Sequence, residues 1–324
     1  MMKLIRPREA YFLAAVFVTL LVSATDGLTA QASVGQLTLE RIFSSQEFSS
    51  ERFGPARWLA DGSGYTTVER SATAPGLDIV RYDPASGERE ILVAAERLVP
   101  SSGSRPLILD DYEWSDDGSK LLVYTNTRRV WRTNSRGDYW VLDLENGRLL
   151  QVGGDADEST LMFAKFSPQA DRVAYVRDHD VYVERLSDGS ITKLTEGGSE
   201  TLINGTFDWA YEEEFGIQDG FRWSPDGQHI AYWQIDASGV KEFLLINNTD
   251  SLYPRITSIP YPKVGEVLSS ARVGVVPADG GETVWARIPG DARNNYIARM
   301  EWAANSHEIV VQHLNRAQNT NEVM

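Results

Sequence analysis

The chain contains no cysteine among its 324 residues and only four histidines. Without cysteine, neither a disulfide framework nor a thiolate metal site can form. The histidines lie in separate segments and lack the helical spacing of a metal-binding pair; they are His179, His229, His307 and His313. We therefore expect no metal site and no cofactor.

Basic residues are also fewer than acidic ones, with 31 lysines and arginines against 46 aspartates and glutamates, which gives a net charge of −15. A nucleic-acid partner requires clustered positive charge, so the composition argues against one. Hydrophobic residues make up 42% of the chain, which allows a sizeable core. The length suits one large all-β domain or two smaller domains.

Only one long apolar run occurs, at residues 11–22, and Lys3, Arg6 and Arg8 precede it. The small-x-small sequence Ala30-Gln31-Ala32 follows it. Twelve residues are few for a membrane span, which needs about 20. The pattern predicts a signal peptide over residues 1–32 and export to the periplasm or the extracellular space, with an uncleaved membrane anchor as the alternative. Residues 33–49 are expected to form a linker or a first strand.

A repeat begins after this segment, and each copy has an aromatic anchor, a polar turn and a strand. The anchors lie about 50–60 residues apart until the last gap of about 80; they are Trp58, Trp114, Phe166, Trp223 and a degenerate copy at Trp302. Between them, strand-like segments end in Ser-Gly, Asn-Gly or Asp-Gly, which are hairpin signals. Each unit thus reads as four short strands.

This period predicts an all-β fold, a β-propeller of four-stranded antiparallel blades over residues 50–324. The aromatic anchors should be buried between blades, and the Asp-Gly turns should close hairpins. A β-sandwich competes, but would not repeat one motif at this period. About five units are present where propellers have four to eight, so the propeller is expected to be incomplete at its carboxy-terminal end. The wide gap before Trp302 predicts a further unit with decayed anchors.

Two segments break the repeat. The first, residues 208–215, places Glu212, Glu213 and Glu214 between aromatic residues. Asp208 suits an N-cap and Gly216 a helix end, which predicts a short helix. On a helix, Glu213 and Glu214 can face one cavity, where their repulsion would recruit a cation such as an amine. The alternative is a solvated acidic helix face.

The second break is the polar and basic insertion at residues 128–135, which contains Arg132. A repeat scaffold needs neither insertion, and function is commonly carried by such departures. We expect Arg132 to lie on the same side of the ring as the acidic helix.

The chain resembles the dipeptidyl peptidase IV family of serine exopeptidases in these two segments and in Trp223-Ser224-Pro225-Asp226-Gly227. The resemblance spans about residues 40–324 and is continued by the segments 253–265 and 314–316. It implies an eight-bladed propeller joined to a carboxy-terminal α/β-hydrolase domain that carries the Ser, Asp and His of the triad. It also implies that Glu213 and Glu214 bind the substrate's free amino terminus and that Arg132 contacts the substrate carbonyl or backbone.

The chain lacks a Gly-x-Ser-x-Gly nucleophile elbow, so no catalytic residue is assigned and the hydrolase domain is absent from this sequence. The resemblance predicts the substrate-gating propeller of an exported serine-type dipeptidyl peptidase, inactive alone. Its partners would be peptides with a free amino terminus, cleaved after Pro or Ala. Tripeptide release stays open, and a homodimer and membrane attachment are allowed. The alternative is a non-catalytic exported propeller that serves as a binding scaffold.

Overall fold

The computed structural model describes residues 36–50 and 53–324, in two units that divide after Arg52. The expected signal peptide, residues 1–32, lies outside the described residues. The segment 36–50 holds one short π-helix, η1 (Glu40–Ser44), and no strand, so the first strand allowed for residues 33–49 is not found there. Among all described residues, no helix combines the length and the apolar character that crossing a membrane requires.

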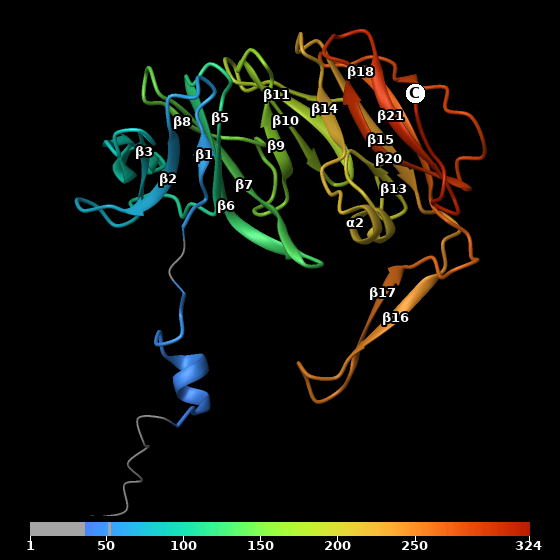
Figure 1. Ribbon diagram of the computed structural model, residues 1–324, viewed down its shortest axis with the longest axis horizontal. Coiled ribbons are helices and arrows are strands. Elements are labelled where there is room, and N and C mark those ends of the chain that lie inside the picture. Colours follow the sequence, from blue (N-terminus) through green and yellow to red (C-terminus); the bar gives the residue numbers. More distant parts are fainter. Residues whose placement is uncertain (1–35, 51–52) are drawn as a thin grey trace, which may run out of the picture. The chain divides into compact units, whose positions relative to one another are not determined.

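Residues 53–324 fold into consecutive antiparallel sheets that follow the chain (Figure 1). The first sheet contains β1 (Arg57–Trp58), β2 (Tyr65–Arg70), β3 (Leu77–Tyr82) and β4 (Arg89–Val93), followed by the 3₁₀ helix η2 (Ala95–Leu98). The second contains β5 (Asp111–Trp114), β6 (Lys120–Val130), β7 (Thr133–Asp143) and β8 (Leu149–Gln151). The third contains β9 (Met162–Phe166), β10 (Arg172–Arg177), β11 (Asp180–Arg185) and β12 (Ile191–Lys193).

The fourth sheet has β13 (Leu202–Asn204) and β14 (Phe221–Trp223) on one edge of β15 (His229–Asp236), with β18 (Ser270–Pro277) and β19 (Val284–Trp285) beyond. The helix α2 (Trp209–Phe215) separates β13 from β14. The fifth sheet contains β20 (Asn295–Trp302), β21 (Ile309–Asn315) and β22 (Asn321–Val323). Strand order within the sheets follows the chain, which is the arrangement of propeller blades and confirms the expected fold class.

The wide gap before Trp302 does not hold a further blade, and that prediction was wrong. Its extra residues form a two-stranded hairpin, β16 (Glu242–Asn247) and β17 (Arg255–Pro260), which pairs with no other sheet among the described residues. Figure 1 shows this hairpin projecting away from the blades. The hairpin interrupts the fourth blade between β15 and β18, which still pair along their full length.

Four hydrophobic clusters fill the four spaces between the five sheets. Alternate residues of one strand serve two clusters: Val173 and Tyr175 of β10 face the second sheet, while Ala174 and Val176 face the fourth. The same alternation divides β15, because Tyr232 faces the third sheet and Trp233 the fifth. Central strands are therefore buried on both faces, which explains their nearly continuous apolar sequence.

The Asp-Gly turns have the structural role that the repeat predicts. Asp117 accepts hydrogen bonds from the Ser115 hydroxyl at 2.6 Å and from the Ser119 amide at 2.9 Å, which lowers the pKa of Asp117 to about 2. Gly118 supplies the positive φ of 66° that the turn requires. These residues close a hairpin, and no chemistry needs to be assigned to them.

The anchors link neighbouring blades, but they are not buried as expected. The indole nitrogens of Trp114 and Trp302 donate across to the preceding sheet, to Thr66 Oγ1 at 2.9 Å and to the Arg222 carbonyl at 3.2 Å. These tryptophans and Phe166 are only half-buried, because each lies at the end of a strand beside the turn. Trp58 is 66% exposed, since no sheet precedes the first one within residues 53–324.

We predict that Trp233→Ala lowers the free energy of unfolding by about 3–5 kcal/mol, as expected for a large buried side chain. Trp233 is 1% exposed, and its indole nitrogen donates to the Ile297 carbonyl of the fifth sheet at 3.0 Å. Trp58→Ala, the matched control, should cost less than about 1 kcal/mol because the ring is exposed. Urea unfolding measures both variants, and equal losses would contradict the assignment of the core.

Candidate functional site

Helix α2 forms where the sequence predicts it. The Asp208 carboxylate accepts a hydrogen bond from the Tyr211 amide at 3.1 Å, which caps the first turn. Gly216 ends the helix in the left-handed conformation, with φ 61° and ψ 36°. The helix is one of the two departures from the repeat, and its position between β13 and β14 places it within the fourth blade.

One face of α2 is fixed in the core. The Tyr211 ring is buried and stacks on Phe207 with a centroid separation of 5.5 Å, and its hydroxyl accepts from the Ile297 amide at 3.2 Å. The Ser269 hydroxyl donates to Asp208. Burial of Asp208 raises the pKa of its carboxyl group. The helix is thus tied to the fourth and fifth blades, and its glutamates have a rigid support.

The side chains of the three glutamates point in different directions, because successive residues of a helix are rotated by about 100° about its axis. Glu213 is half-buried and forms an ion pair with Arg132, whereas Glu214 is exposed. Glu212 lines a cavity whose wall also includes Val130 and Trp131 of strand β6 and the turn after it. Glu213 and Glu214 are neighbours on one short helix, as the sequence predicts, whereas their facing one cavity and their binding of an amine stay predictions.

Arg132 comes from a different blade. Strands β6 and β7 extend beyond the second sheet as a long hairpin, and Trp131 adopts a φ of 53° at its tip. There Arg132 Nε lies 2.8 Å from Glu213 Oε1, which confirms the expected proximity of the two segments. The Arg132 side chain is 75% exposed, so the pair contributes at most about 1 kcal/mol to stability. Both charges are accessible to a ligand.

A further residue, which the sequence analysis missed, joins the same two segments. Gln218 Nε2 donates to Thr133 Oγ1 at 3.0 Å and to Glu212 Oε2 at 3.4 Å. Thr133 follows Arg132 directly, so this bridge holds the hairpin tip beside α2. No motif marks Gln218, because its importance depends only on where the hairpin from the second blade reaches.

The Glu212 carboxylate borders a cavity of about 160 Å³ whose lining is mainly apolar and aromatic. The lining includes Val130, Trp131, Met162, Ile203, Phe207, Trp209 and Pro260. Burial among these groups raises the pKa of Glu212 to about 7, and its hydrogen bond from Gln218 only partly offsets that effect. Glu212 is thus partly protonated near neutral pH.

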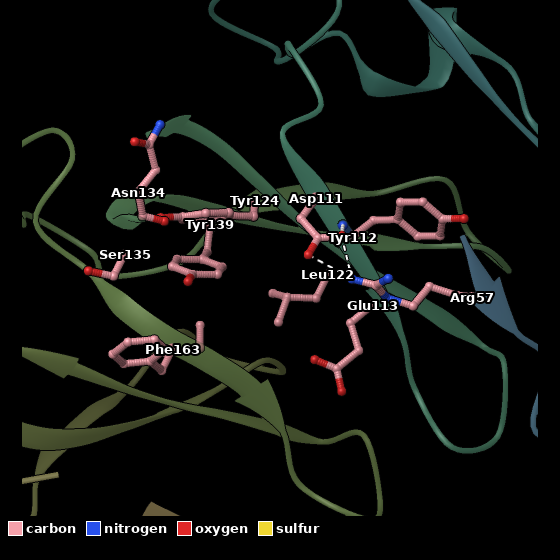
Figure 2. Close-up of a pocket in the computed structure, with 11 residues that line it drawn as sticks. Arg57, Asp111, Tyr112, Glu113, Leu122, Tyr124, Asn134, Ser135, Tyr139 and Phe163 are labelled. Atoms are coloured by element: carbon pink, nitrogen blue, oxygen red, sulfur yellow. Dashed lines mark hydrogen bonds and ion pairs between the residues drawn. The ribbon is translucent and has the colours of Figure 1, made fainter. Parts of the chain in front are cut away.

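A second cavity of about 260 Å³ lies near the base of the β6–β7 hairpin (Figure 2). Arg57 binds both carboxylate oxygens of Asp111, at 2.5 and 2.7 Å, on one side of it. Tyr124, Tyr139 and Phe163 line another side. No sequence motif marks these residues.

Among the residues that the structure describes, no three His, Asp or Glu side chains form a group that could hold a metal ion. The chemistry available at α2 is therefore that of two carboxylates and one guanidinium, which can bind charged and polar groups. No nucleophile with an adjacent base is part of this set.

Comparison with protein families finds that residues 115–324 match the dipeptidyl peptidase IV (DPP IV) N-terminal region. Dipeptidyl aminopeptidase B of Saccharomyces cerevisiae is 31% identical over 211 residues, which cover 63% of this chain and 25% of the yeast protein. A probable dipeptidyl-aminopeptidase B of Pyrenophora teres f. teres is 24% identical over 316 residues, or 91% of this chain and 34% of that protein.

Among solved structures, the crystal structure of Porphyromonas gingivalis dipeptidyl peptidase 4 is similar, with a TM-score of 0.76 and 30% identity. The match covers 89% of this chain and 40% of the P. gingivalis chain. This chain therefore spans about a quarter to two fifths of the length of these relatives.

We predict that Asp208→Ala lowers the free energy of unfolding by about 1–2 kcal/mol, because the Tyr211 amide loses its cap. Asp208→Asn should cost much less, since the asparagine oxygen can accept the same hydrogen bond and carries no buried charge. Urea unfolding of the three proteins measures the difference. If the alanine and asparagine variants lose equal stability, the carboxylate does not act as a helix cap.

We also predict a pH dependence from Glu212, whose pKa rises from an ordinary 4.5 to about 7 in the folded chain. Between these values the folded state holds a proton that the unfolded state has released, so stability falls as pH rises. Glu212→Gln should match the parent at low pH and gain relative stability as pH rises to about 7. Unfolding measured across this range tests it, and a constant difference between the two proteins would contradict it.

Proposed function

Because the chain belongs to the dipeptidyl peptidase IV family, in its N-terminal region, we propose that it is the substrate-gating propeller of a serine-type dipeptidyl peptidase. In this proposal the propeller binds the free amino terminus of a peptide, and a hydrolase domain removes the first two residues, usually after Pro or Ala. The sequence contains no Gly-x-Ser-x-Gly segment, so the catalytic serine would belong to a region outside these 324 residues.

The observation that carries the proposal is the ion pair of Arg132 with Glu213, next to which Glu214 lies on the same helix. Two carboxylates and one guanidinium leave a net charge of −1, which a single ammonium group would neutralise. An ammonium offers three donors, and carboxylates accept such charge-assisted hydrogen bonds strongly. The exposed guanidinium of Arg132 can at the same time donate to a peptide carbonyl.

A fixed amine site also accounts for the release of a fixed number of residues. Helix α2 is held by buried contacts of Tyr211 and Asp208, so its carboxylates keep a constant position. A substrate whose amino terminus is bound there presents one peptide bond at a constant distance to a nucleophile. The distance would select dipeptides, and the pocket for the second residue would select Pro or Ala.

Export, homodimerisation and membrane attachment are further parts of the proposal. The basic residues before the apolar run at 11–22 support export. The β16–β17 hairpin, with Leu244 and Ile246 exposed, offers an apolar surface for a second copy. Fractionation of cells and sedimentation of the purified protein measure these properties directly.

We predict that Glu213→Gln or Glu214→Gln, made in the enzyme that joins this propeller to a hydrolase domain, lowers kcat/KM for free-amine substrates about 30-fold or more. The loss of one partner of a desolvated charge pair costs about 2–5 kcal/mol, which corresponds to that factor. Glu145→Gln removes the same charge from an exposed turn and should leave kcat/KM unchanged.

Acetylation of the substrate amine supplies the second half of the test. It should lower kcat/KM of the parent enzyme by a similar factor and cause little further loss in the two glutamine variants, because both changes remove one contact. If the two losses multiply, or if the variants cleave at the parental rate, α2 is a solvated acidic face. A binding scaffold would show no difference between the free and acetylated amines.

A further inference from the structure

Charged side chains on or beside β1, β5, β9, β14 and β20 form a row of ion pairs that connects neighbouring blades. Arg57 of β1 pairs with Asp111 of β5. Further along the row, Asp219 pairs with Lys165 at 2.5 Å and with Arg222 at 3.3 Å, and Arg222 pairs with Glu301 at 2.9 Å. Three cations and three anions thus neutralise one another, and each has a partner of opposite charge within 4 Å.

Glu113 of β5 belongs to the same row and is the exception. Within the described part of the chain, its carboxylate has neither a hydrogen bond nor an ion pair. Side chains alternate along a strand, so Glu113 shares a face with Asp111, while Tyr112 points to the core. Asp111 is already bound by Arg57, and Glu113 therefore adds one uncompensated negative charge.

Figure 2 shows the Glu113 carboxylate pointing into the cavity of about 260 Å³. Glu113 is an exposed residue of β5 and is reached by solvent. Desolvation by nearby protein atoms nevertheless raises the pKa of Glu113, and the charges of Lys165 and Arg57 only partly offset the effect. A cation within contact distance would relieve the penalty of the charged form.

Aromatic rings form the facing wall of the cavity. Tyr124 and Tyr139 stack with a centroid separation of 4.7 Å, and the Tyr124 hydroxyl donates to the Asn134 carbonyl at 2.9 Å, which fixes the ring. Phe163 completes the wall, and its φ of 53° is a left-handed conformation that is strained for a bulky residue. Strain of this kind concentrates at binding sites, and aromatic faces attract cations.

We propose that this cavity binds an ammonium group on an apolar body, with Glu113 as the counter-ion and the rings of Tyr124 and Phe163 against the body. A cavity of about 150 Å³ accommodates benzene, so this one has room for a ring or an alkyl chain. Two sources share this chemistry: a free organic amine and a lysine side chain of a bound peptide. The site shares no lining residue with α2, and the inference does not rest on the proposed function.

Benzylammonium is a suitable probe, and benzyl alcohol is its neutral analogue. Calorimetric titration of the 324-residue chain at pH 8 should show benzylammonium binding at least tenfold tighter than benzyl alcohol. Glu113→Gln should weaken benzylammonium at least tenfold and abolish the preference, whereas Glu145→Gln should leave it unchanged. Equal affinity in the parent and Glu113→Gln would overturn the proposal, as would a lack of binding to the parent.

Variants of the wall test the aromatic contribution. Tyr124→Leu should weaken benzylammonium about threefold or more, because the ring that packs against the aromatic body of the ligand is lost. Tyr124→Phe keeps the ring and should bind like the parent. If both variants bind equally weakly, the hydroxyl rather than the ring matters, and the proposed wall is wrong.

Glu213→Gln separates this inference from the proposed function. It should leave benzylammonium binding intact, even if it disables recognition of a peptide amino terminus. If Glu213→Gln removes benzylammonium binding and Glu113→Gln does not, the amine binds at α2, and only the present proposal fails.

The source of the ammonium group is distinguished with peptides. Ala-Pro-Ala-Lys-Ala-Ala is compared with the same peptide carrying norleucine in place of lysine. A gain for lysine that disappears in Glu113→Gln identifies a peptide side chain as the ligand. A Glu113 dependence seen for benzylammonium alone identifies a free amine. A Glu113 dependence for neither ligand overturns the proposal.

Discussion

Face-to-face packing between successive sheets is the constraint on which the rest of this structure depends. A small antiparallel sheet is stable only when an apolar face is covered, and here the central strands of the second, third and fourth sheets are covered on both faces. Residues of β10 alternate between two clusters, with Tyr175 facing one neighbour and Val176 the other. Because the packing fixes each blade against the next, the connections and strand ends can vary without loss of the fold.

The functional candidates occupy those variable parts. The β6–β7 extension leaves the second blade, α2 interrupts the fourth, and Arg132 meets Glu213 where the two come together. Buried contacts of Tyr211 and Asp208 hold the helix, and Gln218 holds the hairpin tip through Thr133. The charged side chains themselves contribute little to stability and stay free to contact a ligand.

The two proposed sites share one feature, which is an excess of one negative charge. Helix α2 carries two carboxylates beside one guanidinium. In the row of charged side chains that includes Arg57, Asp111 and Lys165, the other charges are paired and the negative charge of Glu113 is left over. In each place one carboxylate has no partner of opposite charge among the described residues, and a bound cation would neutralise it. The surroundings differ, since Glu214 is exposed whereas Glu113 faces aromatic rings across a cavity. The first setting suits a peptide terminus and the second an apolar amine.

The sequence by itself determined the blade repeat, the Asp-Gly turns and helix α2, because periodicity, turn chemistry and capping act over a few neighbouring residues. It also marked Glu213, Glu214 and Arg132 through their resemblance to a family. Two predictions from the sequence were wrong. Trp58 was expected to be buried but is exposed, because burial depends on a neighbouring sheet. The gap before Trp302 was expected to hold a further blade but holds a hairpin. Gln218 and Glu113 carry no local signal at all. Only the tertiary structure shows what surrounds them, because burial, cavity walls and ion pairs arise between segments that are distant along the chain.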